Sequence, residues 1–441
     1  MGSKVTRLPT KDGLVRLGEL IEVKHGFPFK GEHMTDDLSG LPIVVSIGNF
    51  EYTGGFRFQS TTLREYRGEY PLEYRLQAGD ILLVMTCQTP GGEILGLPGK
   101  IPRDGRTYLH NQRLGKVVIT RPDKIDRDFL YWLFLTTDFN RELVSSATGT
   151  KILHTSPGRI EAARVSIPNL AEQQRVAGIL NTLESKITLL RETNATLEAI
   201  AQAIFKSWFV DFDPVRAKAE GRDPEGVPPE VADLFPSEFK DSELGAIPKG
   251  WRAGSVDEEF NLVMGQSPPG CSYNEEGDGV PFFQGRTDFG FRFPTNRMYC
   301  SAPTRFALPG DTLVSVRAPV GDINMALERC CIGRGVASIR HKSGALSFTF
   351  YAMREEENQF AHFESDGTIF GSIGKKDFHA LRLVLPPPDV IEAFESFAAP
   401  LDERVKTNES EMGSLIGLRD TLLPRLMSGK LRISDLLTES A

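Results

Sequence analysis

The chain has 441 residues, of which 40% are hydrophobic, and this length allows two or three folded domains. Its 51 Lys and Arg residues against 59 Asp and Glu residues give a net charge of −8, which argues against the broadly basic surface of a simple duplex binder. The five cysteines form no Cys-x-x-Cys pair and no run of eighteen apolar residues occurs, so we expect no zinc ribbon, disulfide framework, signal peptide or membrane span, and a reducing cytoplasm fits best.

Residues 1–168 are expected to form a first globular domain, an α+β fold in which strands outnumber helices. Gly79-Asp80 ahead of the apolar run 81–84 indicates a turn that enters a buried strand, and a short helix is expected over 128–139. Residues 1–150 carry 19 basic and 18 acidic side chains, so any surface for nucleic acid has to be local.

A long helix is expected over 169–212. Asn169 follows Pro168 and precedes Glu172 by three residues, which is the pattern of an N-cap with a capping box. Apolar residues then recur with alternating spacings of four and three, the heptad pattern of a coiled coil. The expected seam consists of Val176, Leu180, Leu183, Ile187, Leu190, Asn194, Leu197, Ala201, Ile204 and Trp208.

Residues 213–250 are rich in Pro, Gly and charged residues and are expected to form a linker. A second α+β domain is expected over 251–386, with a short helix over 348–364. Residues 251–375 carry 12 basic and 15 acidic side chains, and ten of the basic ones are Arg, whose planar group can bind guanine or phosphate at two points. A second long helix is expected over 387–428, followed by a C-terminal tail over 429–441.

The two halves of the chain are related by a repeat. Residues 149–168 align without gaps on residues 367–386, 218 residues later, with five identical positions, and the turn at Gly79-Asp80 recurs at Gly310-Asp311. The segment 389–392 is expected to start the second helix with the same capping pattern. The second seam consists of Phe394, Ala398, Leu401, Val405, Asn408, Met412, Leu415, Arg419, Leu422 and Leu426.

Each seam contains one asparagine near its middle, Asn194 and Asn408, and a buried asparagine at such a seam typically fixes register. If the two helices run antiparallel, the two asparagines fall close together. About 38 residues at roughly 1.5 Å each would make a rod on the order of 57 Å, which suits a spacer. A plain hydrophobic core is the alternative interpretation of these seams.

Three segments resemble the specificity (S) subunit of Type I restriction-modification enzymes. They are Ile167-Pro168 with AEQQR at 171–175, LEAIAQAIFKSWFVDFDPV at 197–215, and LPRLMSGKL at 423–431. The order of the chain is also similar to that family, which alternates a target-recognition domain, a helix, a second recognition domain and a second helix. This order covers nearly the whole chain.

The resemblance implies that the two helices form an antiparallel coiled coil separating two target-recognition domains, each of which reads one half of a bipartite, asymmetric DNA target. It implies double-stranded DNA, two methyltransferase (M) subunits and restriction (R) subunits as partners. S-adenosylmethionine, ATP and Mg would act in the partner subunits, for methylation of adenine N6 and for restriction, and none in this chain. The AEQQ segment at 171–174 has no counterpart at 389–392, so the two helices are not expected to dock partners equally.

Catalytic motifs are absent from the sequence. The segment 213–216 lacks the second proline and the aromatic residue of an adenine methyltransferase loop, Gly99-Lys100 lacks the spacing of a P-loop, and the seven histidines show no H-E-x-x-H pattern. A non-catalytic subunit is therefore expected. Two alternatives stay open: a coiled-coil protein-interaction scaffold without DNA specificity, which the acidic balance favours, and an enzyme whose motif is not recognised.

Contacts with DNA are expected from loops and strand ends, where hydroxyl, amide and guanidinium groups can reach base edges and phosphates. In the first domain the candidates are Thr86, Gln88, Asn111, Gln112, Arg113, Lys151 and His154. In the second domain they are Gln284, Arg286, Arg317, Arg334, Ser372, Lys375 and Lys376. Gly149-Thr150 and Gly367-Thr368 begin matching loops, which are either phosphate-binding backbone nests or tight turns.

Overall fold

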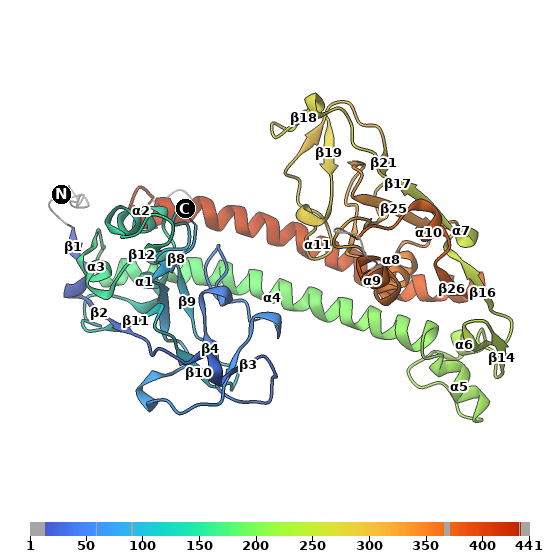
Figure 1. Ribbon diagram of the computed structural model, residues 1–441, viewed down its shortest axis with the longest axis horizontal. Helices are drawn as coiled ribbons and strands as arrows, with labels where there is room; N and C mark the ends of the chain where they lie inside the picture. The colour runs from blue at the N-terminus through green and yellow to red at the C-terminus, as the bar shows by residue number, and fades with distance from the viewer. Residues whose placement is uncertain (1–13, 59, 90, 366–370, 432, 434–441) are drawn as a thin grey trace, which may run out of the picture. The chain divides into compact units, whose positions relative to one another are not determined.

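The computed structural model describes residues 14–58, 60–89, 91–365, 371–431 and 433. The chain divides into two compact units, residues 1–188 with 413–441 and residues 189–412. Each unit contains one sheet-rich domain and parts of two 40-residue helices, α4 (Leu170–Phe209) and α11 (Pro388–Met427), which are green and red in Figure 1. None of the described helices combines the length and the apolar character needed to cross a membrane.

Two sheets form the framework of the first domain. Its strands are β1 (Val15–Arg16), β2 (Ile21–His25), β3 (Met34–Thr35), β4 (Ile43–Val45), β5 (Glu65–Tyr66), β6 (Arg75–Leu76), β7 (Ile81–Val84), β8 (Thr86–Cys87), β9 (Pro98–Lys100), β10 (Tyr108–His110), β11 (Leu114–Ile119), β12 (Leu153–His154) and β13 (Arg164–Val165). A four-stranded sheet has the order β2-β11-β7-β9, and a five-stranded sheet has the order β3-β5-β4-β10-β6. The short pairs β1-β13 and β8-β12 complete the domain.

The second domain repeats this topology. Its strands are β16 (Arg252–Ser255), β17 (Phe260–Met264), β18 (Tyr273–Asn274), β19 (Val280–Phe283), β20 (Tyr299–Cys300), β21 (Phe306–Ala307), β22 (Thr312–Ser315), β23 (Ile323–Met325), β24 (Cys330–Ile332), β25 (Val336–His341) and β26 (Arg382–Leu385). The orders β17-β25-β22-β23, β18-β20-β19-β24-β21 and β16-β26 match those of the first domain element for element. The predicted pair of similar α+β domains is confirmed, although Gly367-Thr368 of the aligned segment lies outside the described residues.

Short helices follow the last strand of the four-stranded sheet in both domains. They are α1 (Arg127–Phe134), α2 (Thr137–Ser146) and α3 (Pro157–Ala162) in the first domain, and α8 (Leu346–Glu355), α9 (Glu357–Ser365) and α10 (Lys375–His379) in the second. The helices expected over 128–139 and 348–364 are therefore each split in two. The first break falls at 135–136, where Thr136 caps the start of α2 by accepting the backbone N–H of Phe139.

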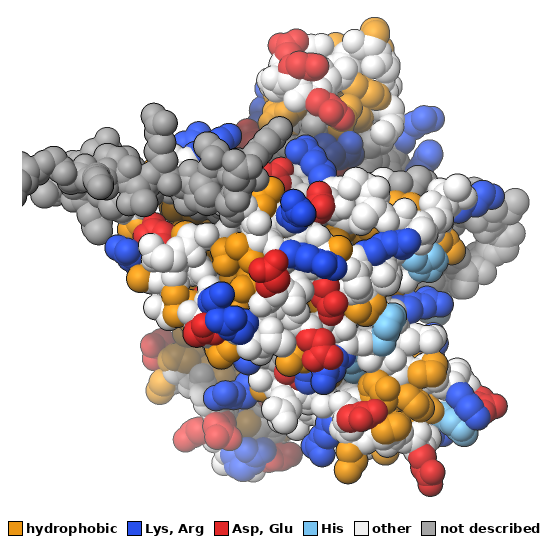
Figure 2. Space-filling model, turned by 90° about the vertical axis from the view of Figure 1, so that its left-hand side faces the viewer, with side chains coloured by type: hydrophobic (Ala, Val, Ile, Leu, Met, Phe, Trp, Pro, Cys, Tyr) orange, Lys and Arg blue, Asp and Glu red, His pale blue; other side chains and the backbone are white. Residues whose placement is uncertain are grey.

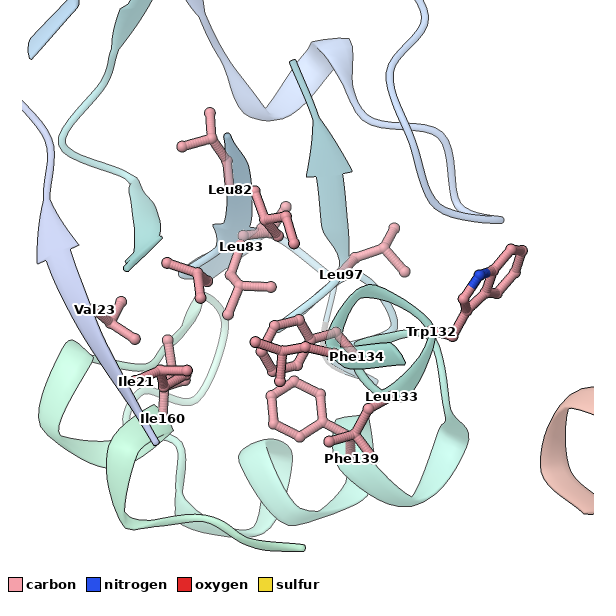
Figure 3. Close-up of a cluster of buried hydrophobic side chains, with 14 of the residues drawn as sticks. Ile21, Val23, Leu82, Leu83, Leu97, Trp132, Leu133, Phe134, Phe139 and Ile160 are labelled. Atoms are coloured by element: carbon pink, nitrogen blue, oxygen red, sulfur yellow. The ribbon is translucent and has the colours of Figure 1, made fainter. Parts of the chain in front are cut away.

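The core of the first domain lies between the four-stranded sheet and helices α1 to α3 (Figure 3). In β2, Ile21 and Val23 point inward and the charged residues between and after them are exposed, as the two-residue period of a strand requires. All four residues of β7 are buried, because this strand is covered on both faces. The five cysteines form no disulfide, and four of them are buried.

Helices α4 and α11 run antiparallel within each unit. In the first unit Val176 and Leu180 of α4 share a core with Leu426 of α11, and in the second unit the rings of Phe205 and Phe394 lie 5.4 Å apart. Residue numbers therefore rise along one helix as they fall along the other. Each of the twenty predicted seam residues is buried or partly buried, so the two heptad seams are confirmed.

The two seam asparagines bind each other, as predicted for antiparallel helices. The Nδ2 of Asn408 donates to the Oδ1 of Asn194 at 2.7 Å, and the Nδ2 of Asn194 donates to Glu409 at 2.8 Å. Both asparagines are fully buried. Burial raises the pKa of Glu409, and the bond from Asn194 counteracts this rise.

Replacing Asn408 by Leu is expected to lower the free energy of unfolding by about 1–3 kcal/mol, because the buried Oδ1 of Asn194 loses its donor. Urea denaturation followed by circular dichroism measures the change. Thr407→Leu is the matched control, since Thr407 is exposed on the same helix and its replacement should change stability by less than about 0.5 kcal/mol. Equal stability of the two variants would contradict the prediction.

The segment 213–250 differs from the expected linker because it is folded. It forms α5 (Asp213–Ala219), α6 (Pro229–Ala232) and a hairpin of β14 (Phe239–Ser242) and β15 (Gly245–Pro248). Val215 and Phe235 are buried, and the rings of Phe235 and Trp208 lie 5.3 Å apart. A few large side chains thus fix the segment on the end of α4 without any periodic apolar pattern.

The second long helix lies within the expected range 387–428, but its start differs from the predicted capping pattern. Asn169 caps α4 as expected, with its Oδ1 accepting the backbone N–H of Glu172 at 3.0 Å. Helix α11 instead starts at Pro388, and the carbonyl oxygen of Pro387 accepts the backbone N–H groups of Val390 and Ile391. The capping box predicted at 389–392 is wrong, because proline at the first helical position needs no donor and already has the helical φ.

Candidate nucleic-acid interface

A three-residue turn connects the two main sheets at the same place in both domains. It consists of residues 111–113 between β10 and β11 and residues 333–335 between β24 and β25. Met85 donates its backbone N–H to the carbonyl of Arg113 at 3.0 Å, and Val316 donates to that of Gly335 at 2.9 Å. The sequence candidates Asn111, Gln112, Arg113 and Arg334 therefore lie on equivalent turns.

Glycine is required beneath each turn. A Cβ on Gly26 would lie 2.1 Å from the carbonyl oxygen of Asn111, and a Cβ on Gly265 would lie 2.1 Å from that of Gly333. Phe27 and Gln266, the next residues, donate to the carbonyls that end β10 and β24, at 2.8 and 3.0 Å. The backbone of each turn is thus fixed by close contact on one side and by hydrogen bonds on the other.

A second loop contact lies beside each turn. In the first domain β8 pairs with β12, and Thr86 binds the Nδ1 of His154 through its hydroxyl at 3.1 Å. In the second domain Arg317 forms a backbone bridge with Ser372. The same strand contact is therefore formed in the two domains by the sequence candidates Thr86 with His154 and Arg317 with Ser372. Thr86 is buried and already bonded, whereas Arg317 is exposed.

In the first domain the turn opens on a hollow of about 1040 Å³. Its lining includes four of the candidates, Gln88, Asn111, Gln112 and Arg113. It also includes residues that the sequence analysis missed, among them Ser46, Tyr52, Arg57 and Arg64 from the loop between β4 and β5. No pattern marks these four in the sequence, because charged and polar residues are ordinary in loops.

In the second domain the corresponding hollow measures about 430 Å³ and is lined by three candidates, Arg317, Arg334 and Ser372. The Nε of Arg334 donates to the hydroxyl of Ser267 at 3.2 Å. The side chain of Arg317 forms no hydrogen bond or ion pair with any described residue and is exposed. Such a guanidinium is available for a phosphate or a base edge.

The other candidates lie around these hollows or apart from them. Gln284 accepts the backbone N–H of Gly335 at 3.1 Å and so lies next to the turn, with its side chain exposed. Arg286 is held by Asp322 at 2.6 Å and is the least free of the four candidate arginines. Lys375 and Lys376 begin α10, directly after the hollow-lining Gly374, and are exposed.

Lys151 is exposed on the loop that Gly149 begins. Gly149 has φ +104°, and a Cβ there would lie 1.9 Å from the carbonyl oxygen of Ile152. Thr148 and His154 exchange backbone hydrogen bonds of 2.8 and 3.0 Å across this loop. The glycine is therefore required by a tight turn, which is the structural one of the two interpretations that the sequence left open.

The charge distribution agrees with local rather than global binding. Figure 2 shows one face of the structure, on which Lys and Arg side chains are interspersed with Asp and Glu side chains. Many exposed cations are paired, for example Arg64 with Asp36 at 3.3 Å. Among the described residues no group of three or more His, Cys, Asp or Glu side chains is placed to hold a metal ion.

His110 closes the turn of the first domain from within the core. Its Nε2 lies 2.8 Å from the carbonyl oxygen of Leu114, and only 2% of the residue is exposed. Burial lowers the pKa of His110 to about 4, although the bond to Leu114 opposes this. The imidazole is therefore neutral at pH 7 and donates from Nε2.

The stability of the first unit is expected to fall as the pH drops from about 6.5 to about 4. The unfolded chain takes up a proton on His110 near pH 6.5, whereas the folded chain does so only near pH 4. The stability that neutral His110 contributes is therefore fully present above pH 6.5 and is lost as the pH falls to about 4. His110→Gln keeps a donor for Leu114 and should reduce this dependence, as measured by urea midpoints at pH 5 and pH 8. An equal change of the urea midpoint between the two pH values in the natural chain and in His110→Gln would contradict the prediction.

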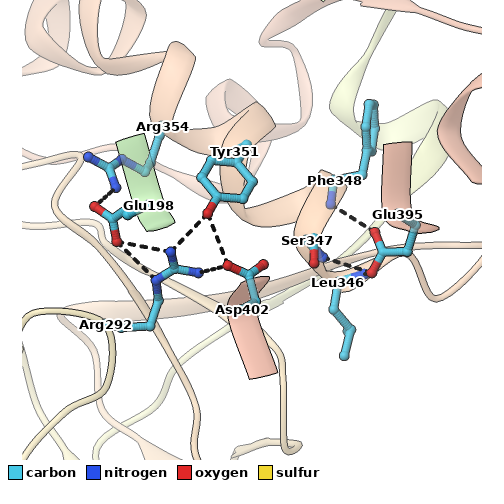
Figure 4. A network of polar contacts seen from close by, with 9 residues as sticks. All are labelled: Glu198, Arg292, Leu346, Ser347, Phe348, Tyr351, Arg354, Glu395 and Asp402. Carbon is cyan, nitrogen blue, oxygen red and sulfur yellow. Dashed lines mark hydrogen bonds and ion pairs between the residues drawn. The ribbon is translucent and has the colours of Figure 1, made fainter. Parts of the chain in front are cut away.

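A buried ionic network fixes the second domain on its helix pair (Figure 4). Arg292, which is 0% exposed, donates to Glu198 of α4 at 2.9 Å, to Asp402 of α11 at 2.7 Å and to the hydroxyl of Tyr351 at 2.9 Å. Its guanidinium also lies 3.9 Å from the ring centre of Phe350. Burial alone would lower the pKa of Arg292, but Asp402, Tyr351 and Glu198 hold it above its usual value.

In each domain, backbone N–H groups at the start of one short helix donate to a side chain of α4 or α11. Glu395 of α11 accepts the backbone N–H groups at the start of α8, from Leu346, Ser347 and Phe348, at 3.0 Å each. In the first domain Gln173 of α4 accepts the N–H of Asp126 at 2.8 Å and is fully buried. Gln173 belongs to the AEQQ segment, so at least this residue of the segment supports its own domain.

The family comparisons agree with this architecture. Residues 13–199 match the model of the Type I restriction modification DNA specificity domain. A putative type I restriction enzyme MjaX specificity subunit of Methanocaldococcus jannaschii is 28% identical over 369 residues, which cover 82% of this chain and 80% of that protein. The type I restriction enzyme HindI specificity subunit of Haemophilus influenzae is 26% identical over 455 aligned positions, which cover 86% of this chain and 99% of that protein.

Among solved structures, the S subunit of a Type I restriction-modification system from M. genitalium superimposes with a TM-score of 0.61 over 96% of this chain and 98% of that one. Its sequence identity is 14%, so it supports the fold alone. The sequence matches and the shared fold agree with the resemblance read from the three sequence segments. Residues 13–199 thus match the Type I restriction modification DNA specificity domain, and the chain is similar over more than four fifths of its length to specificity subunits of type I restriction enzymes.

Proposed function

We propose that this chain is the sequence-specific DNA-binding subunit of a Type I restriction-modification complex, in which each domain reads one half of a bipartite, asymmetric target. The observation that carries the proposal is that the same turn, with a loop contact beside it, recurs in two similar domains and presents different side chains in each. Gln112 and Arg113 are exposed there in the first domain, and Arg317 and Arg334 in the second. A repeated scaffold with different exposed donors and acceptors suits the reading of two different sequences.

The catalytic steps are assigned to partner subunits. Specificity subunits are generally non-catalytic, and we propose the same for this chain. Two M subunits would methylate adenine N6 with S-adenosylmethionine, and R subunits would use ATP and Mg for translocation and cleavage. The family assignment supports DNA reading over the protein-interaction scaffold that the acidic composition suggested.

A gel-shift experiment with the chain and its methyltransferase partner tests the proposal. Retention of DNA that is selective for one sequence and weakens with added salt supports a DNA reader, because phosphate contacts release counterions. Equal retention of all sequences, or no retention at any salt concentration, would refute it. Methyl transfer by the isolated chain would point instead to an enzyme.

Arg317→Ala is expected to weaken binding of specific DNA more than binding of mismatched DNA, by about 1–3 kcal/mol. The reason is that Arg317 is exposed, unpaired within the described residues and placed on the hollow. Competition gel shifts with the two DNAs measure the difference. Equal losses on both would assign Arg317 to phosphate binding, and Arg329→Ala serves as the control, because Arg329 precedes β24, whose other end leads into the turn.

A further inference from the structure

Gln112 and Arg334 occupy the same position in the two domains. Each is the middle residue of the turn that leaves the five-stranded sheet and enters the four-stranded sheet. We propose that this position reads an equivalent base pair in each half-site, and that Gln112 selects adenine whereas Arg334 selects guanine. This inference rests on the proposed function and adds which residues read the bases and which bases they select.

The backbone at this position is held without help from either side chain. The N–H of Gln112 donates to the carbonyl of Phe27 at 3.0 Å, and the flanking Leu114 and Val336 pair with Val84 and Ser315 in the sheets. Both residues are exposed, so their side chains point out of a rigid turn. A rigid backbone with a free side chain is the arrangement that positions a base-reading group precisely.

The amide of Gln112 has a free donor and a free acceptor. Its side chain forms no hydrogen bond with any described residue. Adenine presents N6–H as a donor and N7 as an acceptor in the major groove, so a glutamine amide can bind it at two points. Guanine presents two acceptors there and would leave the amide oxygen facing an acceptor.

The guanidinium of Arg334 is oriented by its neighbour. Its Nε donates to the Oγ of Ser267 at 3.2 Å, and its two terminal nitrogens form no hydrogen bond or ion pair with described residues. The two terminal N–H groups are therefore free to donate, and their spacing matches the O6 and N7 acceptors of guanine. Adenine would present its N6–H donor to one arm of the fork.

Both positions open on the hollows described above. Gln112 lines the hollow of the first domain together with Arg113, and Arg334 lines that of the second together with Arg317. In each case an arginine that is unpaired within the described residues lies beside the proposed reading residue. It can bind a phosphate while its neighbour binds a base edge.

The test is to map methylated motifs in DNA modified by the complete methyltransferase complex, carrying either the natural chain, Gln112→Arg or Arg334→Gln. We expect Gln112→Arg to change one adenine to guanine in one half-site, and Arg334→Gln to change one guanine to adenine in the other. At that position the new base should be preferred over the original one by about 5- to 150-fold, the range of a good two-point contact. Gln77→Arg and Arg329→Gln, at the opposite ends of β7 and β24, should leave the motif unchanged.

An unchanged motif in both exchange variants, with methylation retained, would overturn the inference but not the proposed function. Absence of any two-part motif with the natural chain would overturn the proposed function itself. If an exchange variant gives no methylation, the bound fraction of a randomised oligonucleotide pool is sequenced for that complex. The same letter changes are expected there, and enrichment of the natural sequence, or of none, would contradict the inference.

Discussion

Replacing Arg292 by Met should lower the free energy of unfolding of the second unit by about 3–5 kcal/mol. The guanidinium is buried between carboxylates of both long helices, each with only 12% of its side chain exposed. Its removal leaves Asp402 without its counter-charge and Glu198 with Arg354 alone. Breaking a buried pair on one side costs more than removing both partners. Urea denaturation of the full chain, followed by circular dichroism, provides the measurement.

Two further variants make this prediction specific. Arg286→Met removes an exposed ion pair with Asp322 and should cost less than about 1 kcal/mol. Adding Glu198→Gln and Asp402→Asn to Arg292→Met should recover part of the lost stability, because the buried negative charges are removed with their partner. If Arg292→Met is no more destabilising than Arg286→Met, the network does not hold the domain on its helices.

Phe394→Ala should lower the free energy of unfolding of the second unit by about 3–5 kcal/mol, as is typical of a fully buried aromatic residue. Phe394 is 0% exposed, and its ring lies 5.4 Å from those of Phe205 and Phe209 and 6.0 Å from that of Tyr351. It therefore joins α4 and α11 to the core of the second domain. Thermal and urea unfolding measure the loss.

Phe291 offers the same substitution in a different environment. It is 45% exposed in the same unit, and Phe291→Ala should change stability by less than about 0.5 kcal/mol. Comparable losses in the two variants would show that the aromatic cluster around Phe394 is not the joint between helices and domain.

The long helices could be predicted almost completely, because a heptad pattern depends on short-range spacing. All twenty seam positions, the antiparallel contact of Asn194 with Asn408 and the start of α4 follow from residues close in sequence. The capping pattern predicted for α11 is wrong, since three prolines at 386–388 precede Asp389 and the last of them already belongs to the helix. The folded segment 213–250 was also missed, because its stability comes from Val215 and Phe235 packing on distant residues.

The repeat was visible in the sequence over 149–168 and at the turn of Gly79, but the offsets of the two regions differ. Gly149 and Gly367 are 218 residues apart, the turns at Asn111 and Gly333 are 222 apart, and Gly79 and Gly310 are 231 apart. A single offset therefore aligns the end of the domain and not its middle. The equivalence of Gln112 and Arg334 needed the strand order of both domains, which short-range patterns do not contain.

Individual site residues were predictable by chemical type more than by position. Polar loop residues were proposed in both domains, and the hollows bring together Gln112 with Arg113 and Arg317 with Arg334. Arg286 had the same chemistry but is engaged by Asp322. Arg292 was not proposed for any role, because its partners are 94 and 110 residues away along the chain.

The glycines beneath the two turns bear on how such a protein can diversify. Gly26 and Gly265 let the turn backbone pass close above them, and main-chain atoms of residues 112 and 334 form hydrogen bonds there, to which the side chain of Arg334 adds one bond to Ser267. Folding therefore constrains the glycines strongly and the two exposed side chains hardly at all. Single codon changes at positions 112 and 334 are therefore expected to accumulate in a lineage without loss of the folded state, whereas a Cβ at either glycine would displace the turn above it.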